Sequence, residues 1–508
     1  MKWMDEHVNS FDKPMFICEY AHAMGNAIGN LKEYWESIES STSTIGGAIW
    51  DWVDQAIYEP NEIKKGIYRL HTGYDFPGPH QGNFCSNGII PATREESPKL
   101  KEVKAVYQYV HFGNCDINPK GKEVTVHLCN TYDFLSLDHF YLRWNAVVDG
   151  VELPADSINL SAVAPDDSLA INLKLNGITV KQAAKKGQEL MLNVAVCLKE
   201  AQPWALAGHL LSHYQYTLNE GTAMANRPST VKGKSTYRVE ENEKEIVITN
   251  DLLKAVFQRS TGRMTELVMN GVSFLSHGEG FIYDNHRWIE NDRFTQTANG
   301  LEETGTCSVS ETDGKVVVTT GRKGSLCGTD LVYTFLPNGT MELNAQFTPV
   351  ANQLRRCGLV CGVNSALNQV DYYAYGPWEN YSDRKEGCQV GRYATTVEQM
   401  DEAYVKPQSM GNREGLRELK LTDASGKGIC IRTEGNVSFS ALRYTDEDLM
   451  NTNHMWEMKA RPYTVLHLDA AVRGVGNASC GQDVDTLPVY QVSPLPLSYK
   501  LRFEPCGK

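Results

Sequence analysis

The sequence lacks long hydrophobic runs and is poor in positive charge. No stretch reaches the ~18 consecutive apolar residues that a membrane-spanning helix needs, which excludes a transmembrane helix. The 49 Lys and Arg residues are outnumbered by 62 Asp and Glu residues, giving a net charge of −13. This excess of negative charge argues against nucleic acid or an anionic membrane as the main partner.

The cysteines do not form the motifs that cysteine chemistry usually requires. There are 13 of them, and no two are spaced as CxxC. Zinc-ligand spacing is therefore absent, and a disulfide framework is not expected in a chain of 508 residues. We expect mostly buried free thiols. The opening residues MKWMDEH also lack the features of a secretory signal peptide.

The composition is that of a globular protein, with 41% hydrophobic and 22% charged residues. Its length suggests about three domains. Near the start, two short apolar runs, 15–18 and 45–50, flank apolar residues at helical spacing. This order predicts a buried strand, a helix that Asn26 caps and that ends near Ser40, and a second buried strand. Such a βαβ unit places its two strands side by side and parallel.

The rest of the chain is patterned as β-structure. Alternating apolar residues at 124–128 and 190–198, with a hairpin signal at Asp149-Gly150, predict a β-sandwich of immunoglobulin-like type from about residue 111. The polar composition of residues 219–233 predicts a linker. The remaining ~270 residues are predicted to be nearly all β. Their local signals are hairpins at Asn270-Gly271 and Asn338-Gly339 and a strand at 464–468.

Two chemistry-bearing residues follow the predicted parallel strands. Glu19 comes directly after the first strand, and Trp50 begins the Trp50-Asp51-Trp52 run after the second. Functional groups collect at the carboxyl ends of parallel strands. A carboxylate beside an indole suits glycoside hydrolysis, in which the carboxylate attacks the anomeric carbon. From these residues alone, a purely structural explanation stays open, with Glu19 a buried carboxylate and Trp50 part of the core.

Other site chemistries also have candidates. Glu19 and His22 form an E-x-x-H pair, but di-metal carboxylate sites need that pair twice, and no second copy is found. Cys18 lies beside His22 in sequence, yet it falls inside the apolar run and is expected to be inert core. The loop 84–88 could bind a hard cation through a backbone carbonyl and an amide oxygen, or it could simply turn.

Several longer motifs resemble one family, the large bacterial β-galactosidases of glycoside hydrolase family 2. The resemblance runs from about residue 13 to the end, and CEYAHAMGN is its most specific stretch. The matching segments are CEYAHAMGN (18–26), GGAIWDWVDQ (46–55), YGPWENYSDR (375–384), YVKPQ (404–408) and REL (417–419). The resemblance implies a retaining glycoside hydrolase that cleaves terminal non-reducing β-D-galactosides of the lactose type.

The resemblance also implies roles for individual residues. Glu19 matches the catalytic nucleophile, and His22 and Trp50 match residues that contact the galactosyl unit. Phe84, through its carbonyl, and Asn87 match two ligands of a sodium ion. A magnesium ion is implied as well, with ligands outside this chain.

The architecture implied by the resemblance is mainly β. Residues 1–110 correspond to strands seven and eight of a TIM barrel, 111–220 to an immunoglobulin-like β-sandwich, and 235–508 to a galactose-mutarotase-like β-supersandwich. A TIM barrel takes eight strands, so about six strands and the acid/base Glu have no counterpart here. We therefore expect a chain that is inactive or nearly so alone, and a homo-oligomer when complete. The natural N-terminus is expected to be missing, which leaves the compartment, cytoplasm or periplasm, undecided.

Two alternative hypotheses remain open beside this interpretation, and the sequence departs from the family pattern at two places. The chain could be a non-catalytic subunit that complements another chain, or a stand-alone carbohydrate-binding protein. Gly481 stands where some relatives place a tryptophan over the substrate, which puts aglycone stacking in doubt. The stretch WIENDR (288–293) replaces the usual Arg-Ala-Pro entry to an acidic element, and nothing in the sequence explains that change.

Overall fold

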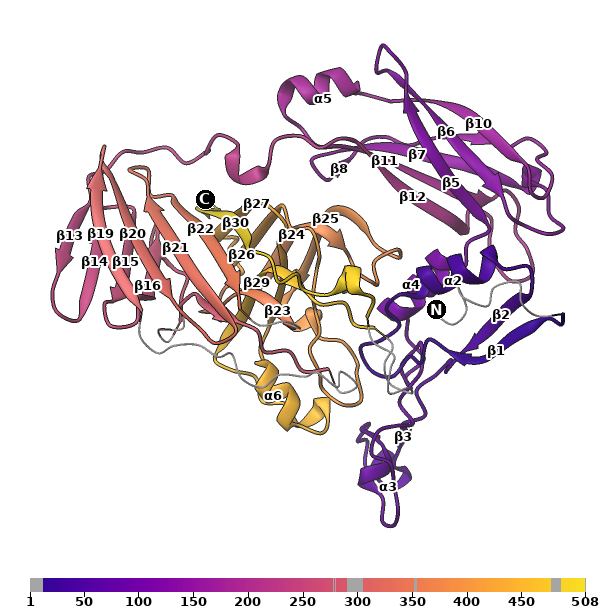
Figure 1. Ribbon diagram of the computed structural model, residues 1–508, viewed down its shortest axis with the longest axis horizontal. Helices are drawn as coiled ribbons and strands as arrows, with labels where there is room; N and C mark the ends of the chain where they lie inside the picture. The colour runs from indigo at the N-terminus through magenta and orange to yellow at the C-terminus, as the bar shows by residue number, and fades with distance from the viewer. Residues whose placement is uncertain are drawn as a thin grey trace. The chain divides into compact units, whose positions relative to one another are not determined.

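The computed structural model describes residues 12–276, 278, 280–289, 305–350, 354–476 and 486–507. The chain divides into two compact units (Figure 1). The larger unit comprises Met1–Lys101, Met224–Lys385 and Tyr393–Lys508, and the smaller comprises Glu102–Ala223 and Glu386–Arg392. The N-terminal segment and the C-terminal β-domain thus belong to one compact unit.

The larger unit begins with the predicted βαβ segment. Its elements are β1 (Met15–Tyr20), α2 (Leu31–Ser40) and β2 (Thr44–Ile49). Strands β1 and β2 pair in parallel, with Tyr20 opposite Ile49, which confirms the predicted pairing. After them come β3 (Ile57–Tyr58), α3 (Pro60–Ile63), β4 (Leu70–His71) and α4 (Pro98–Val106).

One face of β1 and β2 is open, contrary to the prediction of buried strands. Phe16 is 55% exposed and Ile45 is 66% exposed. Cys18, expected to be inert core, is exposed as well. That prediction is wrong because no element of the described chain covers the face that carries Phe16 and Ile45, whereas parallel sheets in folded proteins are normally covered on both sides.

Helix α2 begins later than its sequence pattern predicts. The backbone has φ of 62° at Ile28 and 59° at Asn30, values that a right-handed helix cannot contain. The helix therefore starts at Leu31, and the prediction that Asn26 caps it is wrong. Asn26 instead directs its side-chain amide to the C-terminal β-domain.

The smaller unit is a β-sandwich with its core between two sheets. The strands are β5 (Val110–Ile117), β6 (Glu123–Asn130), β7 (Phe140–Val148), β8 (Val151–Glu152), β9 (Asp156–Asn159), β10 (Ser168–Lys174), β11 (Leu190–Leu198) and β12 (Leu210–Asn219). One sheet has the order β10-β6-β5, and the other has the order β12-β11-β7-β8, with β9 on β7. Val126 from the first sheet and Leu142 and Leu192 from the second share one core. The Asp149-Gly150 hairpin is confirmed, with positive φ at both residues.

The capped helix α5 (Val180–Lys186) connects β10 to β11. Thr179 accepts a hydrogen bond from the Gln182 backbone, and Gln182 in turn accepts one from the backbone of Thr179. Gly187 ends the helix in the left-handed conformation, with φ of 63°. After β12, the predicted linker is irregular apart from the short 3₁₀ helix Met224–Asn226.

The described residues of the C-terminal β-domain, in the larger unit, form three sheets. The first has the order β13-β14-β15-β16-β17, the second β18-β23-β29-β28, and the third β19-β20-β21-β22-β30-β27-β26-β24-β25. Their bounds are β13 (Arg238–Glu241), β14 (Glu245–Thr249), β15 (Leu253–Gln258), β16 (Arg263–Met269), β17 (Val272–Ser273), β18 (Ile282–Asp284), β19 (Thr306–Thr312), β20 (Lys315–Arg322), β21 (Cys327–Phe335), β22 (Met341–Pro349), β23 (Arg356–Asn364), β24 (Gln369–Gly376), β25 (Gln389–Thr396), β26 (Glu418–Thr422), β27 (Gly428–Glu434), β28 (Ser438–Leu442), β29 (Tyr463–Val472) and β30 (Leu497–Cys506). The hairpins at 270–271 and 338–339 are confirmed.

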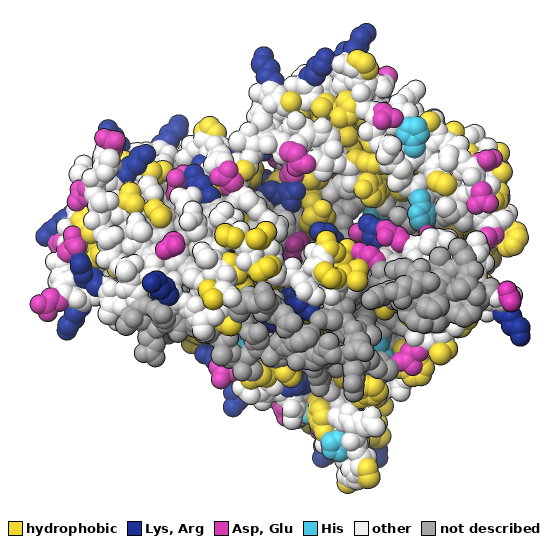
Figure 2. All heavy atoms as spheres, in the orientation of Figure 1, with side chains coloured by type: hydrophobic (Ala, Val, Ile, Leu, Met, Phe, Trp, Pro, Cys, Tyr) yellow, Lys and Arg dark blue, Asp and Glu magenta, His cyan; other side chains and the backbone are white. Residues whose placement is uncertain are grey.

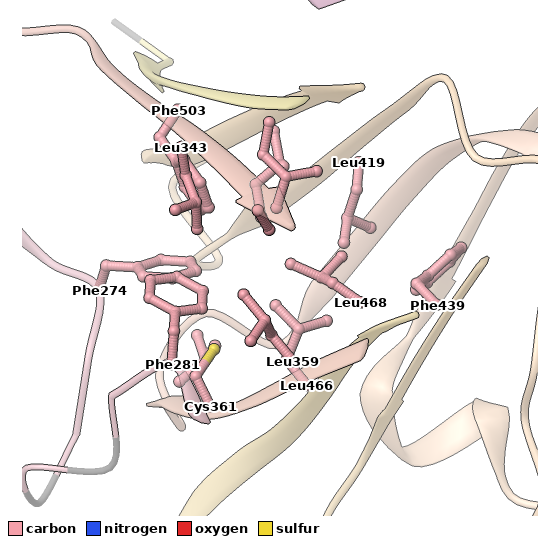
Figure 3. Close-up of a cluster of buried hydrophobic side chains, with 14 of the residues drawn as sticks. Phe274, Phe281, Leu343, Leu359, Cys361, Leu419, Phe439, Leu466, Leu468 and Phe503 are labelled. Atoms are coloured by element: carbon pink, nitrogen blue, oxygen red, sulfur yellow. The ribbon is translucent and has the colours of Figure 1, made fainter. Parts of the chain in front are cut away.

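The sheets of this domain share one hydrophobic core (Figure 3). Phe503 on β30 lies 5.5 Å from Phe281 and 5.8 Å from Phe274, measured between ring centroids. Leu359 on β23 and Leu468 on β29 belong to the same core and are fully buried. The core therefore joins the four-stranded sheet to the nine-stranded sheet.

A buried ion network lies beside this core. Arg356 on β23 contacts three carboxylates, at 3.2 Å for Asp446, 3.5 Å for Asp469 and 3.6 Å for Asp284. Asp469 is 1% exposed, and neither of its carboxylate oxygens has a hydrogen-bond partner. Burial raises the pKa of Asp469 to about 7, the neighbouring Asp284 and Asp446 add to this rise, and Arg356 opposes it.

This raised pKa predicts how stability depends on pH. The folded state binds a proton at Asp469 between about pH 4 and pH 7 that the unfolded chain has released, so stability is lost as the pH rises through 7. Asn at this position does not titrate. From pH 5 to pH 8, the free energy of unfolding of the unsubstituted chain should fall. We expect this fall to be smaller by about 1–3 kcal/mol in Asp469→Asn.

The measurement is urea unfolding of both proteins at the two pH values. The exposed Asp371→Asn on β24 is the matched control and should follow the unsubstituted chain. Parallel pH profiles for Asp469→Asn and the unsubstituted chain would contradict the prediction.

On the face drawn in Figure 2, acidic and basic side chains of the described residues are interspersed rather than segregated. Within the described ranges, none of the helices combines the length and apolar character required to cross a bilayer.

Candidate active site

The structure places Glu19 and Trp50 at the same edge of the parallel strand pair. The backbone N–H of Trp50 donates to the Tyr20 carbonyl at 3.1 Å, and the Ala23 N–H donates to the Trp50 carbonyl at 2.7 Å. Glu19 is exposed, and Trp50 is 42% exposed. The alternative in which both side chains are buried structural groups is therefore wrong. A carboxylate and an indole are instead accessible at the carboxyl ends of adjacent strands.

His22 lies just beyond Glu19 and is buried. Its ring is 3% exposed and lies 5.5 Å from the Phe84 ring, with the two planes tilted by 30°. Burial lowers the pKa of His22, whereas the carboxylates of Glu19 and Asp51 oppose this shift. His22 is therefore neutral at pH 7, and a neutral imidazole can donate one hydrogen bond and accept another.

The loop that contains Phe84 and Asn87 packs against the end of β2. The Asn87 carbonyl accepts a hydrogen bond from the Asp51 N–H at 2.6 Å, and Asn87 Nδ2 donates to the Phe84 carbonyl at 3.0 Å. Asn87 Oδ1 is buried and has no hydrogen-bond partner. Because amide oxygen and nitrogen have nearly the same shape, a flipped amide would place Oδ1 beside the Phe84 carbonyl. Two such oxygens are ligands that a hard cation accepts.

The five residues singled out from the sequence thus form one cluster. Glu19, His22 and Trp50 surround the end of the strand pair, and Phe84 and Asn87 reach it from the following loop. That loop is held in register because the Asp54 N–H donates to the Ile90 carbonyl at 3.0 Å.

Lys99 belongs to the site, although sequence reasoning missed it. Its ammonium group donates to the carbonyls of Ala23 at 2.7 Å, Gly25 at 3.1 Å and Gly88 at 2.5 Å, and the side chain is buried. Burial lowers the pKa of Lys99 to about 8, with Asp54 opposing the shift. Lys99 thereby ties the loop that carries His22 to the loop that carries Asn87. Nothing in its sequence context, the first turn of a helix, distinguishes it from a surface lysine.

Replacing Lys99 tests how much it contributes to the stability of the larger unit. We expect Lys99→Met to destabilise the larger unit by roughly 2–4 kcal/mol, because three buried carbonyls lose a charged donor. Chemical unfolding followed by tryptophan fluorescence measures the change. The exposed Lys65→Met is the matched control and should remain within about 0.5 kcal/mol of the unsubstituted chain. Equal stability of the two variants would contradict the role of Lys99.

Comparison with known families agrees with this geometry. Residues 1–112 match the model of the glycosyl hydrolases family 2 TIM barrel domain, and residues 126–219 match β-galactosidase domain 4. Residues 248–504, half of the chain, match the β-galactosidase small chain. The chain belongs to the β-galactosidase family. The predicted fold class is confirmed in its mainly β character, its TIM-barrel fragment and its β-sandwich followed by a large β-domain. The likeness of that last domain to galactose mutarotases stays a prediction.

Curated relatives match nearly the whole chain. The β-galactosidase of Priestia megaterium is 29% identical over 481 residues, which are 91% of this chain and 45% of that protein. The β-galactosidase of Halalkalibacterium halodurans is 27% identical, covering 98% of this chain and 49% of that protein. The chain therefore spans about half the length of the curated relatives it matches, and it corresponds to their C-terminal half.

Among solved structures, the galactose 1-epimerase from Lactobacillus acidophilus aligns with 54% of this chain and all of its own. The TM-score is 0.33 and the identity is 11%.

The two departures from the family pattern fall largely outside the described residues. This applies to Gly481 and to residues 290–293 of the altered WIENDR stretch. Trp288 at its start is described. Its backbone N–H donates to Ser409 Oγ at 2.8 Å, and its indole N–H donates to the Pro407 carbonyl at 3.2 Å.

Proposed function

We propose that this chain is part of a retaining β-galactosidase that hydrolyses terminal non-reducing β-D-galactosides, with Glu19 as the nucleophile. The observation that carries the proposal is the accessible Glu19 carboxylate at a parallel strand end, beside neutral His22 and exposed Trp50. A retaining glycosidase needs such a carboxylate and a second carboxyl group about 5 Å away.

Each residue has a defined part in this reaction. A Glu19 oxygen forms a bond to the anomeric carbon while the bond to the leaving oxygen breaks, and the second carboxyl group protonates that oxygen. The same group then removes a proton from water, which releases galactose from Glu19. Neutral His22 hydrogen-bonds a galactosyl hydroxyl, and the exposed face of Trp50 packs against the sugar ring.

The ions implied by the family are part of the proposal. The Phe84 carbonyl and Asn87 Oδ1 would supply two neutral ligands to a sodium ion, and the orphaned Asn87 Oδ1 supports this assignment. When bound, the ion would neutralise charge and orient sugar hydroxyls near Glu19. A third, acidic ligand and the ligands of a magnesium ion would come from polypeptide outside these 508 residues.

The same outside polypeptide would complete the barrel. The exposed faces at Phe16 and Ile45 support this proposal, because a two-stranded parallel sheet leaves apolar surface that further strands and helices would cover. We therefore propose that the chain alone is inactive or nearly so. From the family resemblance we also propose that the complete enzyme is a homo-oligomer and that it functions in the cytoplasm or periplasm.

The test compares the purified chain with a fusion to the N-terminal half of the Priestia megaterium enzyme, both from a host without β-galactosidase. We expect the fusion, and not the chain alone, to hydrolyse o-nitrophenyl β-D-galactoside. NMR should show β-galactose as the first product. Robust turnover by the chain alone would overturn the proposed incompleteness, and α-galactose as the first product would overturn the retaining mechanism. Activity from the two halves expressed as separate chains would favour the complementing-subunit reading.

A further inference from the structure

The loop between β1 and α2, residues 21–30, has an unusual backbone. Positive φ occurs at Ala21 (46°), Gly25 (56°), Ile28 (62°) and Asn30 (59°), and three of these four residues are not glycine. Non-glycine residues avoid this region unless surrounding structure imposes it. The loop carries His22, so whatever imposes its conformation also determines where His22 lies.

The C-terminal β-domain receives the polar groups of Asn26. Asn26 Nδ2 donates to the Tyr381 hydroxyl and to the Ser409 carbonyl, each at 2.8 Å. The backbone N–H of Asn26 donates to Gln408 Oε1 at 3.1 Å. Asn26 is fully buried, so these hydrogen bonds form away from water and define one position for the loop.

A second set of contacts holds the following residues of the loop. Arg384 Nη1 donates to the Ala27 carbonyl at 2.8 Å, and the Asn30 N–H donates to the Asp383 carbonyl at 2.9 Å. Arg384 is itself fixed by a buried ion pair of 2.6 Å with Glu379. The ion pair therefore holds the Arg384 guanidinium in a fixed position in the C-terminal β-domain, next to the loop.

The two surfaces approach so closely that only glycine fits at two loop positions. A Cβ at Gly25 would lie 2.3 Å from Gln408 Nε2, and a Cβ at Gly29 would lie 2.0 Å from Asp383 Oδ2. Both distances are far below van der Waals contact. The glycines of this loop are thus explained by side chains more than 350 residues away in the sequence.

We infer that Tyr381, Gln408 and Arg384 are positioning residues of the active site, which set the loop conformation that places His22 beside Glu19. None of the three needs to touch the substrate, since each acts through a hydrogen bond to the loop. The inference rests on the proposed function only in assuming that His22 contacts the galactosyl unit. The positioning itself is a property of this chain and can be measured without a substrate.

The experiment uses the full chain and the double variant Tyr381→Phe/Gln408→Met. This variant removes one hydroxyl and one amide and leaves the Arg384–Glu379 ion pair intact. Tyr499→Phe is the matched control, because Tyr499 is equally buried and loses one hydrogen bond, to the Leu468 carbonyl, away from the loop. Hydrogen exchange of the loop amides and the NMR ring signals of His22 at one fixed pH are the two measurements.

We expect the double variant to exchange the amides of residues 23–30 at least about tenfold faster. We also expect the ring signals of His22 to shift and broaden at constant pH, because a loosened loop no longer holds the ring in one position against Phe84. Tyr499→Phe should change neither quantity. Unchanged exchange and unchanged His22 ring signals in the double variant would overturn the inference.

Should the double variant fail to fold, Tyr381→Phe and Gln408→Met are measured singly, with smaller shifts expected in the same direction. Because no galactoside enters these measurements, failure of the proposed hydrolysis would leave their outcome standing. Conversely, unchanged exchange of the loop amides would leave the assignment of Glu19 as nucleophile unaffected.

Discussion

Substitution Glu19→Gln is expected to lower galactoside turnover by at least about 10³-fold in the fusion that supplies the rest of the barrel. The amide has almost the same shape as the carboxylate, but it carries no negative charge and does not attack the anomeric carbon. Binding contacts from His22 and Trp50 remain. The loss should therefore appear in kcat for o-nitrophenyl β-D-galactoside, with a much smaller change in KM.

The control for this prediction is Glu39→Gln, the same substitution at an exposed position of α2, which should stay within about twofold of the unsubstituted fusion. A second variant, Glu19→Ala, examines the role more directly. Azide added to it should enter the vacated space and give α-galactosyl azide, the anomer that a single displacement produces. Retention of more than a tenth of the activity in Glu19→Gln would rule out the nucleophile assignment.

The largest stability effect is expected at Phe503, in the shared core of the C-terminal β-domain (Figure 3). Phe503 is fully buried on β30, opposite Met341 of β22 and Ile431 of β27, and its ring contacts Phe274 and Phe281. Phe503→Ala removes a ring at the junction of several elements. We expect it to cost about 3–5 kcal/mol, because a packed core collapses only partly around such a cavity.

Urea unfolding followed by circular dichroism measures this loss in the transition of the larger unit. Leu495→Ala is the control within the same unit, since Leu495 is 68% exposed and should change stability by less than about 0.5 kcal/mol. A loss below about 1 kcal/mol for Phe503→Ala would mean that the core rearranges freely, contrary to close packing.

Much of the local structure could be predicted from the sequence, because neighbouring residues decide it. The Asp149-Gly150 and Asn270-Gly271 pairs adopt the positive φ that two-residue hairpins require, and both hairpins form where predicted. The order of apolar runs around residues 15–50 sufficed to predict a parallel βαβ unit. That topology in turn predicted that Glu19 and Trp50 lie at one sheet edge, since parallel strands end on the same side.

Burial and loop conformation could not be predicted in this way. The apolar runs of β1 and β2 predict buried strands. Phe16 and Ile45 are nevertheless exposed, because no described element covers them. Likewise, Asn26 has the chemistry of a helix cap and serves instead as a contact to Tyr381. The choice between these uses depends on a partner that is distant in sequence.

The sequence by itself determined the parallel pairing of β1 and β2, the hairpins and the carboxylate–indole pair at a strand end, since steric preference and chain connectivity act between near neighbours. Only the tertiary structure decided the burial of His22, the place of Lys99 and the conformation of residues 21–30. Those features depend on carbonyls and side chains that meet across tens to hundreds of residues. Their positions follow from satisfying buried polar groups in the folded chain, a condition that no local pattern expresses.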